Sequence, residues 1–523
     1  MRIFLSGLMG SGKSTVAREV AHRLGVPCLD LDAEIERRAG VDIPTLFERE
    51  GERAFRALEV ETLRLLLGDV EDAVVALGGG TVANVESRHA LLRAGTLVTL
   101  DADLAELVRR VAGEGGRPLL QGVDPERRLR ELLSSRADAY AECHGRVPSG
   151  ARDPRAIAED VVALARRELI AVPLGRRTYR VEVGSGVRHG SGAHAAAMCD
   201  GDKLLLVSDR NVAPHWANSL RGALEAEGRK VVEVVLPPGE EHKSIETVNL
   251  IWERALDGGM DRGCGVVSLG GGVVGDLAGF AASTLLRGIP VGHLPTTVLS
   301  MADSAIGGKT GFDTRHGKNL VGTFHQPSFV TCDVEVLGTL PERDRISGLA
   351  EIAKSAWLAG ESEVAAIEDD AAALRRGEPE ALIRAVRMSA TLKARIVTED
   401  ERESGTRALL NLGHTVGHAL EAAEGYAGLR HGEAVALGMV AAFKLAVKLG
   451  SARTDDQQRA RALLSSLGLP VDVEGRLDAA TLAYIAADKK RRGGQVTFVI
   501  PGAPGEVELR PLPLEQVGDL LRM

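Results

Sequence analysis

The chain has 523 residues, of which 44% are hydrophobic and 26% are charged, and its formal net charge is −9. This length is too great for one hydrophobic core, so we expect an ordinary soluble protein with roughly three or four domain-sized units. The net negative charge argues against general binding to nucleic acid or to anionic membranes, because both partners require an extended basic surface.

The five cysteines are scattered and show no CxxC spacing, which is typical of reduced thiols in the cytoplasm. The N-terminal segment reaches glycine at Gly7, too early for a signal peptide, and no apolar run approaches the ~18 residues of a membrane span. We therefore expect a cytoplasmic protein that acts on small molecules, without nucleic acid or membrane as a partner.

A phosphate-binding pattern follows the first apolar strand, Arg2 to Ser6. Residues 7–15, GLMGSGKST, match GxxxxGK[ST] and precede a helical stretch. In such a loop glycine amides surround phosphate oxygens, the lysine reaches the outer phosphates and the first hydroxyl can bind Mg²⁺. The pattern predicts a site for ATP with Mg²⁺, formed by Gly10, Ser11, Gly12, Lys13, Ser14 and Thr15.

An acidic pair follows in PCLDLD, residues 27–32, which we predict to be a strand. Because strand side chains alternate, Asp30 and Asp32 would lie on the same side. Such a carboxylate pair requires a cation or a hydroxyl partner, and Mg²⁺ and a substrate alcohol would supply them.

Arginines and glycines that suit an acidic substrate follow. Arg56 lies in a predicted helix, three glycines end the buried strand VVAL, and GEGGRPLL reads as a glycine-hinged flap that carries Arg117. Each arginine alone is more often a surface residue, but a kinase for an acidic substrate needs guanidinium groups for carboxylate and phosphoryl oxygens. The set is Arg56, Gly78, Gly79, Gly80, Arg117 and Arg136.

With these residues in place, residues 1–170 resemble the shikimate kinases over the whole length of that small family. The resemblance implies transfer of phosphate from ATP to shikimate, with Lys13, Asp32 and Arg117 catalytic. It also implies that Ser14 and Asp30 hold Mg²⁺ and that Arg117 closes over the phosphates. Shikimate would be held by Asp32, Arg56, Gly78, Gly79, Gly80 and Arg136. The alternative is another small-molecule or nucleotide kinase of the same fold.

A second α/β region is predicted after a helix at 154–170, and we place the domain boundary at 171. Strands such as KLLLVSD, KVVEVVLP and GVVSL alternate with helices up to 338, which indicates a parallel sheet. GVVSL leads into Gly270, Gly272 and Gly275, the GxGxxG spacing of dinucleotide sites. The usual acidic residue about twenty positions later is missing, so Asp209 and Glu240 become candidates for the ribose.

Residues 287–319 concentrate Arg287, Lys309 and Lys318 among glycines and apolar residues. Cations in such surroundings, rather than among other charges, suggest a cleft for an anionic ligand.

The third region, residues 339–523, is predicted to be mainly helical and holds three histidines. His414 and His418 stand four apart on one helix face, and His431 follows a glycine-containing turn. Three imidazoles can hold Zn²⁺, although single helix histidines are more often structural. Spacing alone favours His414 with His418 as the ligand pair.

Five blocks, GGGVVGD, SAIGGKTG, LAEIAK, NLGHTVGHALE and RHGEAVALGM, make residues 171–523 similar to the 3-dehydroquinate synthases. The resemblance implies NAD⁺- and metal-dependent conversion of 3-deoxy-D-arabino-heptulosonate 7-phosphate to 3-dehydroquinate and phosphate. The resemblance also implies that Glu351, His414 and His431 bind Zn²⁺ or Co²⁺, in place of the pair that helical spacing favours. His418 would then lie in the substrate pocket. The resemblance further suggests a homodimer through residues 171–523.

The same resemblance implies two larger residue sets. The NAD⁺ contacts would be Asp209, Asn211, Glu240, Lys243, Gly271, Gly272, Asp276, Thr296, Thr297, Lys309 and Lys318. The contacts to the seven-carbon substrate would be Arg287, Asp303, Lys309, Asn319, Lys354, Lys393, Arg407, Asn411 and His418, with Lys489 or Lys490 as further candidates. Lys309, Lys393, Asn411 and His418 would be catalytic.

The predicted fold class is therefore α/β: an N-terminal P-loop kinase domain with a parallel sheet, an α/β dinucleotide-binding part at 171–338, and a mainly helical metal-binding part at 339–523. Two alternatives remain. For the second domain, one is a metal-dependent polyol dehydrogenase, which would release NADH. The other is that either part of the chain is a binding or regulatory domain without activity.

Overall fold

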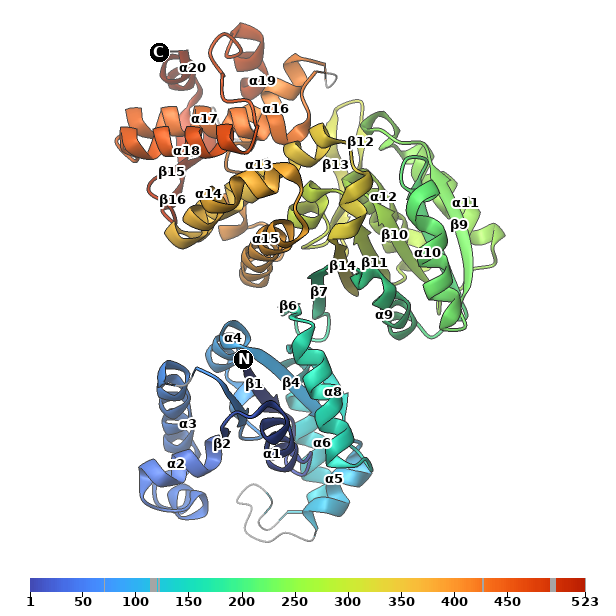
Figure 1. The fold of residues 1–523 in the computed structure, drawn as a ribbon, viewed down its shortest axis with the longest axis vertical. Coiled ribbons are helices and arrows are strands. Elements are labelled where there is room, and N and C mark those ends of the chain that lie inside the picture. Colours follow the sequence, from blue (N-terminus) through green and yellow to red (C-terminus); the bar gives the residue numbers. More distant parts are fainter. Residues whose placement is uncertain (70, 113–119, 121–122, 426–427, 490–494, 523) are drawn as a thin grey trace. The chain divides into compact units, whose positions relative to one another are not determined.

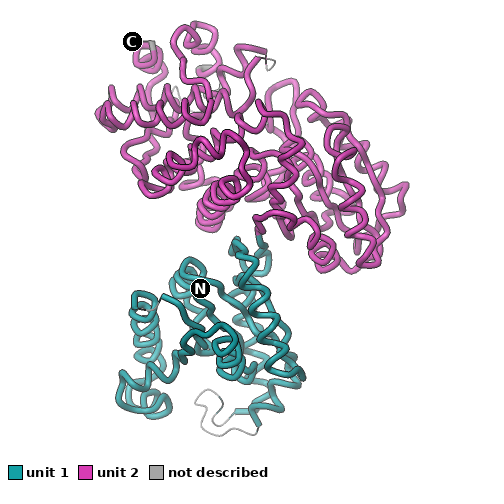
Figure 2. The backbone as a smooth tube through the Cα atoms, viewed as in Figure 1, with its two compact units in different colours: residues 1–180 teal, residues 181–523 magenta. Residues whose placement is uncertain are grey.

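The computed structural model describes residues 1–69, 71–112, 120, 123–425, 428–489 and 495–522. The chain forms two compact units, unit 1 at 1–180 and unit 2 at 181–523 (Figure 2). Within these residues, no helix is both long and apolar enough to cross a membrane. The domain boundary at 171 and the inner boundary between 338 and 339 stay predictions.

Unit 1 is built on a five-stranded parallel sheet with the strand order β2-β3-β1-β4-β5 (Figure 1). Its strands are β1 (Arg2–Ser6), β2 (Cys28–Asp30), β3 (Ala73–Ala76), β4 (Thr96–Asp101) and β5 (Gly145–Pro148). Its helices are α1 (Lys13–Leu24), α2 (Leu31–Ala39), α3 (Ile43–Asp69), α4 (Val85–Ala94), α5 (Leu104–Val111), α6 (Pro125–Ser135), α7 (Ala137–Ala141) and α8 (Pro154–Arg166).

Two hydrophobic layers cover the faces of this sheet, because successive strand residues point to opposite sides. Ile3 and Leu5 pack in one layer with residues of α1 and α8, whereas Phe4 packs in the other layer with residues of α2 to α6. The strands are parallel, so the ends of β1, β2 and β3 meet at one edge. This arrangement brings the phosphate loop, Asp30 and the three glycines to the same edge.

One predicted element of unit 1 is wrong in its extent. The strand predicted over residues 27–32 ends at Asp30, and helix α2 begins at Leu31. The physical reason is a helix cap, because the Asp30 carboxylate accepts a hydrogen bond from the backbone N–H of Asp32 at 3.1 Å. Asp32 therefore lies in the first turn of a helix instead of on a strand face.

A buried histidine makes the stability of unit 1 depend on pH. His144 is 7% exposed, and its Nδ1 accepts the backbone N–H of Leu97 on β4 at 3.0 Å. Burial and the charge of Arg180 lower the pKa of His144 from 6.5 to about 4. Between these values the unfolded chain binds the extra proton, so stability is complete above pH 6.5 and is lost as the pH falls toward 4.

We expect the free energy of unfolding of unit 1 to fall by about 3 kcal/mol as the pH is lowered from 6.5 to 4, because His144 stays neutral in the folded state. Hydrogen exchange of the β4 peptide, corrected for the intrinsic rate at each pH, measures the loss. His144→Asn keeps an acceptor for Leu97 without titrating, so it should flatten the dependence. An equally steep dependence in that variant would contradict the assignment.

The larger sheet has seven strands in the order β6-β7-β14-β11-β10-β8-β9, and unit 2 contains its residues from Val181 of β7 onward. The neighbours from β14 to β9 are parallel. The strands are β6 (Ile170–Val172), β7 (Tyr179–Gly184), β8 (Lys203–Asp209), β9 (Lys230–Leu236), β10 (Gly265–Gly270), β11 (Val291–Pro295) and β14 (Phe329–Asp333). The helices that accompany them are α9 (Ser191–Met198), α10 (Ala213–Ala226), α11 (Ile245–Asp257) and α12 (Gly272–Thr284).

A hairpin and a helical part complete unit 2. The hairpin joins β12 (Lys309–Thr314) to β13 (Gly317–Phe324) in antiparallel fashion. The helices are α13 (Glu342–Ala359), α14 (Glu361–Arg376), α15 (Pro379–Glu399), α16 (His414–Ala423), α17 (His431–Lys448), α18 (Thr454–Ser466), α19 (Ala479–Lys489) and α20 (Leu514–Arg522). The predicted closing strand is β15 (Gln495–Pro501), which pairs with β16 (Val507–Pro513).

Helices α16 and α17 pack backbone to backbone, which fixes the distance between the histidines they carry (Figure 1). A Cβ atom on Gly438 of α17 would lie 1.9 Å from the carbonyl oxygen of Gly413, the residue before His414. Any larger side chain at 438 would therefore force the two helices apart.

We expect Gly438→Ala to destabilise unit 2 by about 1–3 kcal/mol through this overpacking. Trp357 reports the loss by fluorescence during thermal unfolding, because its ring lies 4.7 Å from that of Phe443 on α17. Gly222→Ala is the matched control: it lies in α10, a Cβ there meets nothing within 4 Å, and it should be neutral or stabilising. Equal stability of the two variants would contradict the packing argument.

Candidate active sites

The phosphate loop of unit 1 runs from β1 into α1. Gly12, the residue before α1, has the left-handed φ of 89°, and a Cβ on Gly7 would lie 2.5 Å from the Leu100 carbonyl oxygen. The Lys13 amine donates to the carbonyl oxygens of Gly7 and Leu8 at 3.0 and 3.2 Å. The loop thus holds the Lys13 ammonium at the first residue of α1, and a cation at a helix N-terminus suits a phosphate site.

The acidic pair lies beside this loop. The Ser14 hydroxyl donates to Asp30 at 2.7 Å, so the two predicted Mg²⁺ ligands are in contact. Burial, with the charges of Asp30, Glu59 and Glu36, raises the pKa of Asp32 to about 6, although Lys13 opposes the shift. A carboxylate with this pKa is mostly ionised at neutral pH and is a stronger base than an ordinary aspartate.

The structure brings the predicted shikimate residues together around the glycine segment. Arg136 donates to the Gly79 carbonyl oxygen at 2.7 Å. A Cβ on Gly80 would lie 2.5 Å from Arg56 Nη1, and one on Gly78 would lie 2.8 Å from Asp32 Oδ1. The glycines therefore allow two guanidinium groups and a carboxylate to approach one short backbone segment. Arg117 lies outside the described residues.

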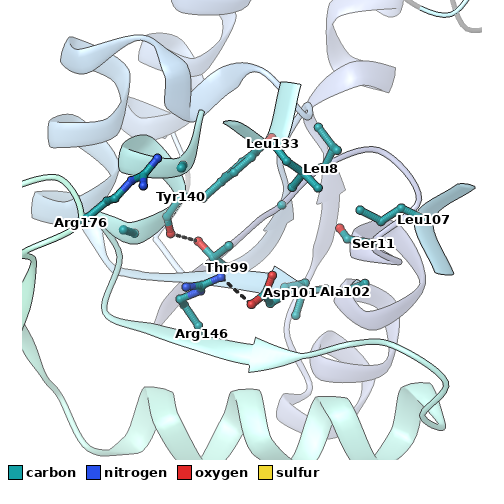
Figure 3. A pocket seen from close by; sticks show the side chains of 14 residues that line it. Leu8, Ser11, Thr99, Asp101, Ala102, Leu107, Leu133, Tyr140, Arg146 and Arg176 are labelled. Atoms are coloured by element: carbon teal, nitrogen blue, oxygen red, sulfur yellow. Dashed lines mark hydrogen bonds and ion pairs between the residues drawn. The ribbon is translucent and has the colours of Figure 1, made fainter. Parts of the chain in front are cut away.

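A cavity of about 400 Å³ also opens in unit 1. It lies between the phosphate loop, represented by Leu8 and Ser11, and α7, represented by Tyr140 (Figure 3). An ion pair between Arg146 and Asp101 borders it at 2.5 Å. The residues predicted for shikimate do not line this cavity; they are Asp32, Arg56, Gly78, Gly79, Gly80 and Arg136.

In unit 2, the residues predicted for NAD⁺ gather at the carboxyl edge of the parallel strands. Asp209 ends β8, Gly271 follows β10, and the backbone N–H of Thr296 after β11 donates to the Gly270 carbonyl oxygen at 2.9 Å. A Cβ on Gly271 would lie 3.1 Å from the Thr297 methyl carbon. Nucleotides bind at this edge in open α/β sheets.

Ion pairs link further residues of the NAD⁺ set. Lys243 is 4% exposed and pairs with Asp276 on α12 at 2.7 Å. Glu240 lies 3.5 Å from Lys318 of the hairpin. The backbone N–H of Asn211 donates to Asp209 at 2.8 Å. These contacts link six of the predicted cofactor residues in three pairs.

The predicted metal ligands converge from three helices. Glu351 of α13 lies with its Oε1 atom 3.7 Å from Nε2 of His414 and 3.9 Å from Nε2 of His431. Their ligand atoms lie within 4.8 Å of one another. The carboxylate oxygens of Glu351 are buried and accept no hydrogen bond from the described residues, although Lys354 forms an ion pair with one of them. A buried acceptor facing two imidazole nitrogens fits a divalent metal.

A second group of possible ligands shares one histidine with the first. His418, Glu421 and His431 also lie within 4.8 Å of one another by their ligand atoms. His418 is exposed, and its ring lies 5.3 Å from that of His414 and 5.8 Å from that of His431. The three histidine rings thus form one cluster with centroids 5.3–5.8 Å apart, which the helical spacing of His414 and His418 alone predicted only in part.

The pKa values of His414 and Glu421 are both lowered, so the imidazole is neutral and the carboxylate is charged. Burial and the charge of Lys354 lower the pKa of His414, which keeps it neutral as a metal ligand must be. Burial would raise the pKa of Glu421, but hydrogen bonding and charge from His431, with Lys318 and His418, lower it to about 2.

Two buried ion pairs place lysine ammonium groups near the predicted metal ligands. Lys354, 1% exposed, pairs with Glu351, and Lys393 donates to Asp303 at 2.5 Å. Burial, Arg407 and Lys354 lower the pKa of Lys393 to about 8 despite this partner.

The remaining predicted substrate residues divide into two groups. Lys309 and Asn411 both bind Glu403, at 2.5 and 3.0 Å, and the buried Arg407 donates to the Gly307 carbonyl oxygen at 3.0 Å. Arg287 is exposed, and the backbone N–H of Asn319 donates to Asp313 at 2.9 Å. The Lys489 side chain and Lys490 lie outside the described residues.

Comparison with known proteins gives the families. Residues 9–166 match the model of shikimate kinase, and residues 233–347 and 348–491 match the N-terminal and C-terminal models of 3-dehydroquinate synthase. A 3-dehydroquinate synthase from Geobacter metallireducens is 44% identical over 338 residues, which are 65% of this chain and 94% of that protein. The chain belongs to the shikimate kinase and 3-dehydroquinate synthase families.

Two of the solved structures that match the chain cover different shares of it. A 2-deoxy-scyllo-inosose synthase complexed with carbaglucose-6-phosphate, NAD⁺ and Co²⁺ is 26% identical with a TM-score of 0.62, and it covers 68% of this chain and 99% of that chain. A shikimate kinase from Acinetobacter baumannii in complex with shikimate is 38% identical with a TM-score of 0.30, and it covers 31% of this chain and 91% of that chain.

The predicted families, fold class and enzyme classes are therefore confirmed. The chain is a bifunctional enzyme of the shikimate pathway that joins a kinase, a transferase, to a synthase, a lyase. The roles of individual residues stay predictions.

Sequence reasoning missed two residues of the kinase unit. Glu59, 2% exposed, binds Arg56 at 2.9 Å and accepts the Thr81 hydroxyl at 2.7 Å. Arg110 donates to the Gly10 carbonyl oxygen at 3.1 Å and to that of Ser149 at 2.9 Å. The spacing of Arg56 and Glu59 on a helix could have indicated the first, whereas no pattern pointed to Arg110.

In the synthase unit, Glu403 and Glu421 were not predicted from the sequence. Glu403 has a positive φ of 57° and lies between Lys309 and Asn411, and Glu421 touches His431. Glu421 stands three residues after His418, a helical spacing that could have indicated it.

Proposed function

We propose that the kinase unit uses ATP to phosphorylate shikimate, giving shikimate 3-phosphate. The observation that carries this proposal is the contact of Ser14 with Asp30 next to Lys13. Asp32, Arg56 and Arg136 lie close by, around one glycine segment. Ser14 and Asp30 would hold Mg²⁺, which neutralises phosphate charge when bound.

In this proposal, the chain's own residues position the reactants. Arg56 and Arg136 bind the shikimate carboxylate through paired N–H groups. Asp32 holds the reacting hydroxyl and accepts its proton, for which a carboxylate with a pKa near 6 is suited. Lys13 and the backbone amides of residues 10–15 stabilise the transferring phosphoryl group.

We also propose that the synthase unit converts 3-deoxy-D-arabino-heptulosonate 7-phosphate to 3-dehydroquinate and phosphate. The observation that carries it is the convergence of Glu351, His414 and His431 beside buried lysines. These three residues would hold Zn²⁺ or Co²⁺, and the residues at the sheet edge would hold NAD⁺. When bound, NAD⁺ accepts and returns a hydride, and the metal acidifies adjacent hydroxyls.

The cations of the synthase unit would bind the substrate's anionic groups. Lys354, Lys393 and Arg407 are buried and fixed by partners, so they present charge with little loss of side-chain entropy on binding. Lys393, with its pKa near 8, can hold or release a proton near neutral pH. His418 is exposed within the histidine group and is proposed to exchange a proton with the substrate.

A cytoplasmic location and a homodimer through the synthase unit complete the proposal. The five cysteines are free thiols, which supports a reducing compartment.

Paired assays on the purified chain test both activities. We expect ADP release that requires shikimate, and phosphate release from the heptulosonate phosphate that requires catalytic amounts of NAD⁺. Net accumulation of NADH from a simple polyol, without phosphate release, would contradict the synthase proposal and favour a dehydrogenase. ADP release with other acceptors but not with shikimate would contradict the kinase proposal.

A further inference from the structure

Glu421 is a buried carboxylate to which the proposed reaction assigns no role. It lies on α16 and is 4% exposed. Its Oε2 atom is 3.4 Å from Nδ1 of His431, and its Oε1 atom is 3.5 Å from the Lys318 amine. Each oxygen of this carboxylate therefore faces a different positive or hydrogen-bonding group.

The two ring nitrogens of His431 face two different carboxylates. Nε2 points toward Glu351 at 3.9 Å, and Nδ1 points toward Glu421 at 3.4 Å. A neutral imidazole carries one N–H group and one lone pair, so a hydrogen bond donated by Nδ1 leaves the lone pair on Nε2. The lone pair would then face Glu351 and His414, where a metal ion would bind.

We propose that Glu421 is a positioning residue that fixes the tautomer and the ring orientation of His431, and that Lys318 holds Glu421 in place for this role. The inference rests on the proposed function, in which His431 is a metal ligand. Carboxylates that accept the second N–H of a ligand histidine act in this way in metal sites generally.

The contacts favour this role over direct metal binding by Glu421. Both oxygens of Glu421 already have a partner, His431 or Lys318. Of the two oxygens of Glu351, Oε2 pairs with Lys354, whereas Oε1 accepts no hydrogen bond from the described residues and faces Nε2 of His414 and of His431. A metal bound by Glu421 would use Nδ1 of His431 and would leave Nε2, Glu351 and His414 without an ion.

Glu421→Gln is the test variant. Its amide would have to present N–H₂ either to Lys318, where it repels the ammonium, or to His431, where it stabilises the wrong tautomer. Competition between the full-length protein and a fluorescent zinc chelator gives the Zn²⁺ affinity. We expect Zn²⁺ to bind about 10–100-fold more weakly than in the unchanged protein.

Glu433→Gln is the matched control. Glu433 stands two residues after His431, yet its carboxylate binds Arg343 at 2.7 Å and the backbone N–H of Arg430 at 2.9 Å. Its removal should leave Zn²⁺ affinity within about threefold, because the imidazole keeps its partner. An equal loss in both variants would mean that helix packing, not the Glu421 carboxylate, sets the affinity, and would overturn the proposal.

His431→Ala separates this inference from the proposed function. If His431→Ala binds Zn²⁺ normally, the proposed ligand set fails and the inference fails with it. If His431→Ala loses Zn²⁺ while Glu421→Gln keeps full affinity, only the inference fails. A loss in Glu421→Gln as large as that in His431→Ala would make Glu421 a ligand and would also overturn it.

Proton NMR of the unchanged protein tests the same proposal if the variants do not fold. In the Co²⁺-loaded protein, His414 and His431 should each keep an Nδ1–H group, since Nδ1 of His414 lies 3.2 Å from the Leu412 carbonyl oxygen. We expect two exchangeable, paramagnetically shifted N–H resonances in the proton NMR spectrum. A histidine bound through Nδ1 would instead keep its N–H group on Nε2, so the position of the proton is read from nuclear Overhauser effects. The N–H proton of His431 should lie close to its own β protons. Contact with the ring Cδ2–H proton instead would show that Nδ1 binds the metal, which would overturn the proposal.

Discussion

Lys13→Met is expected to lower shikimate phosphorylation by at least about 10²–10³-fold while dehydroquinate formation stays within about twofold. The Lys13 ammonium lies in the phosphate loop, on the Gly7 and Leu8 carbonyl oxygens, and methionine keeps its length without its charge. The two rates are measured on the same preparation, so the synthase rate reports whether the chain is folded.

The lysine content of the kinase unit allows a direct check of this assignment. Lys13 is the only lysine among residues 1–180. Acetylation of amines in that unit, read by mass spectrometry, therefore reports on Lys13 apart from the N-terminus. ATP with Mg²⁺ should protect it, and shikimate alone should not. Kinase activity in Lys13→Met close to that of the unchanged protein would refute the role.

The sequence predicted the parts of both sites that depend on local spacing. The phosphate loop needs only a strand, a glycine-rich turn and a helix in order, and residues 2–24 supply them. The alternation of strands and helices likewise predicted the parallel sheets, because a parallel connection requires a crossover. These features depend on residues within short segments, so a single sequence is enough to predict them.

The errors and omissions arise where residues distant in sequence meet. Whether Asp32 follows a strand or starts a helix depends on the cap that Asp30 provides, and strand alternation cannot reveal it. Helical spacing paired His414 with His418, whereas the structure brings Glu351 from another helix to within 3.7 Å of His414. Only the family resemblance predicted Glu351, since nothing local connects residue 351 with residue 414.

His431→Ala is expected to lose the metal of the synthase unit, and His418→Ala is expected to retain it. Nε2 of His431 lies 3.9 Å from Glu351 Oε1, on the buried side that His414 also faces, whereas His418 lies on the exposed side of the group. Metal content by elemental analysis after dialysis distinguishes the variants, and we expect the affinity of His431→Ala to fall more than about 100-fold, beyond the effect of an outer partner.

Chelation should reproduce the same loss in the unchanged protein, with synthase activity abolished and then restored by Zn²⁺ or Co²⁺. Kinase activity should survive chelation once Mg²⁺ is supplied again, because its ligands belong to unit 1. His418→Ala should still lose most synthase turnover, since the proposed proton transfer is removed while the metal remains. The opposite pattern, with metal lost from His418→Ala and kept in His431→Ala, would make His414 and His418 the ligand pair that helical spacing alone favours.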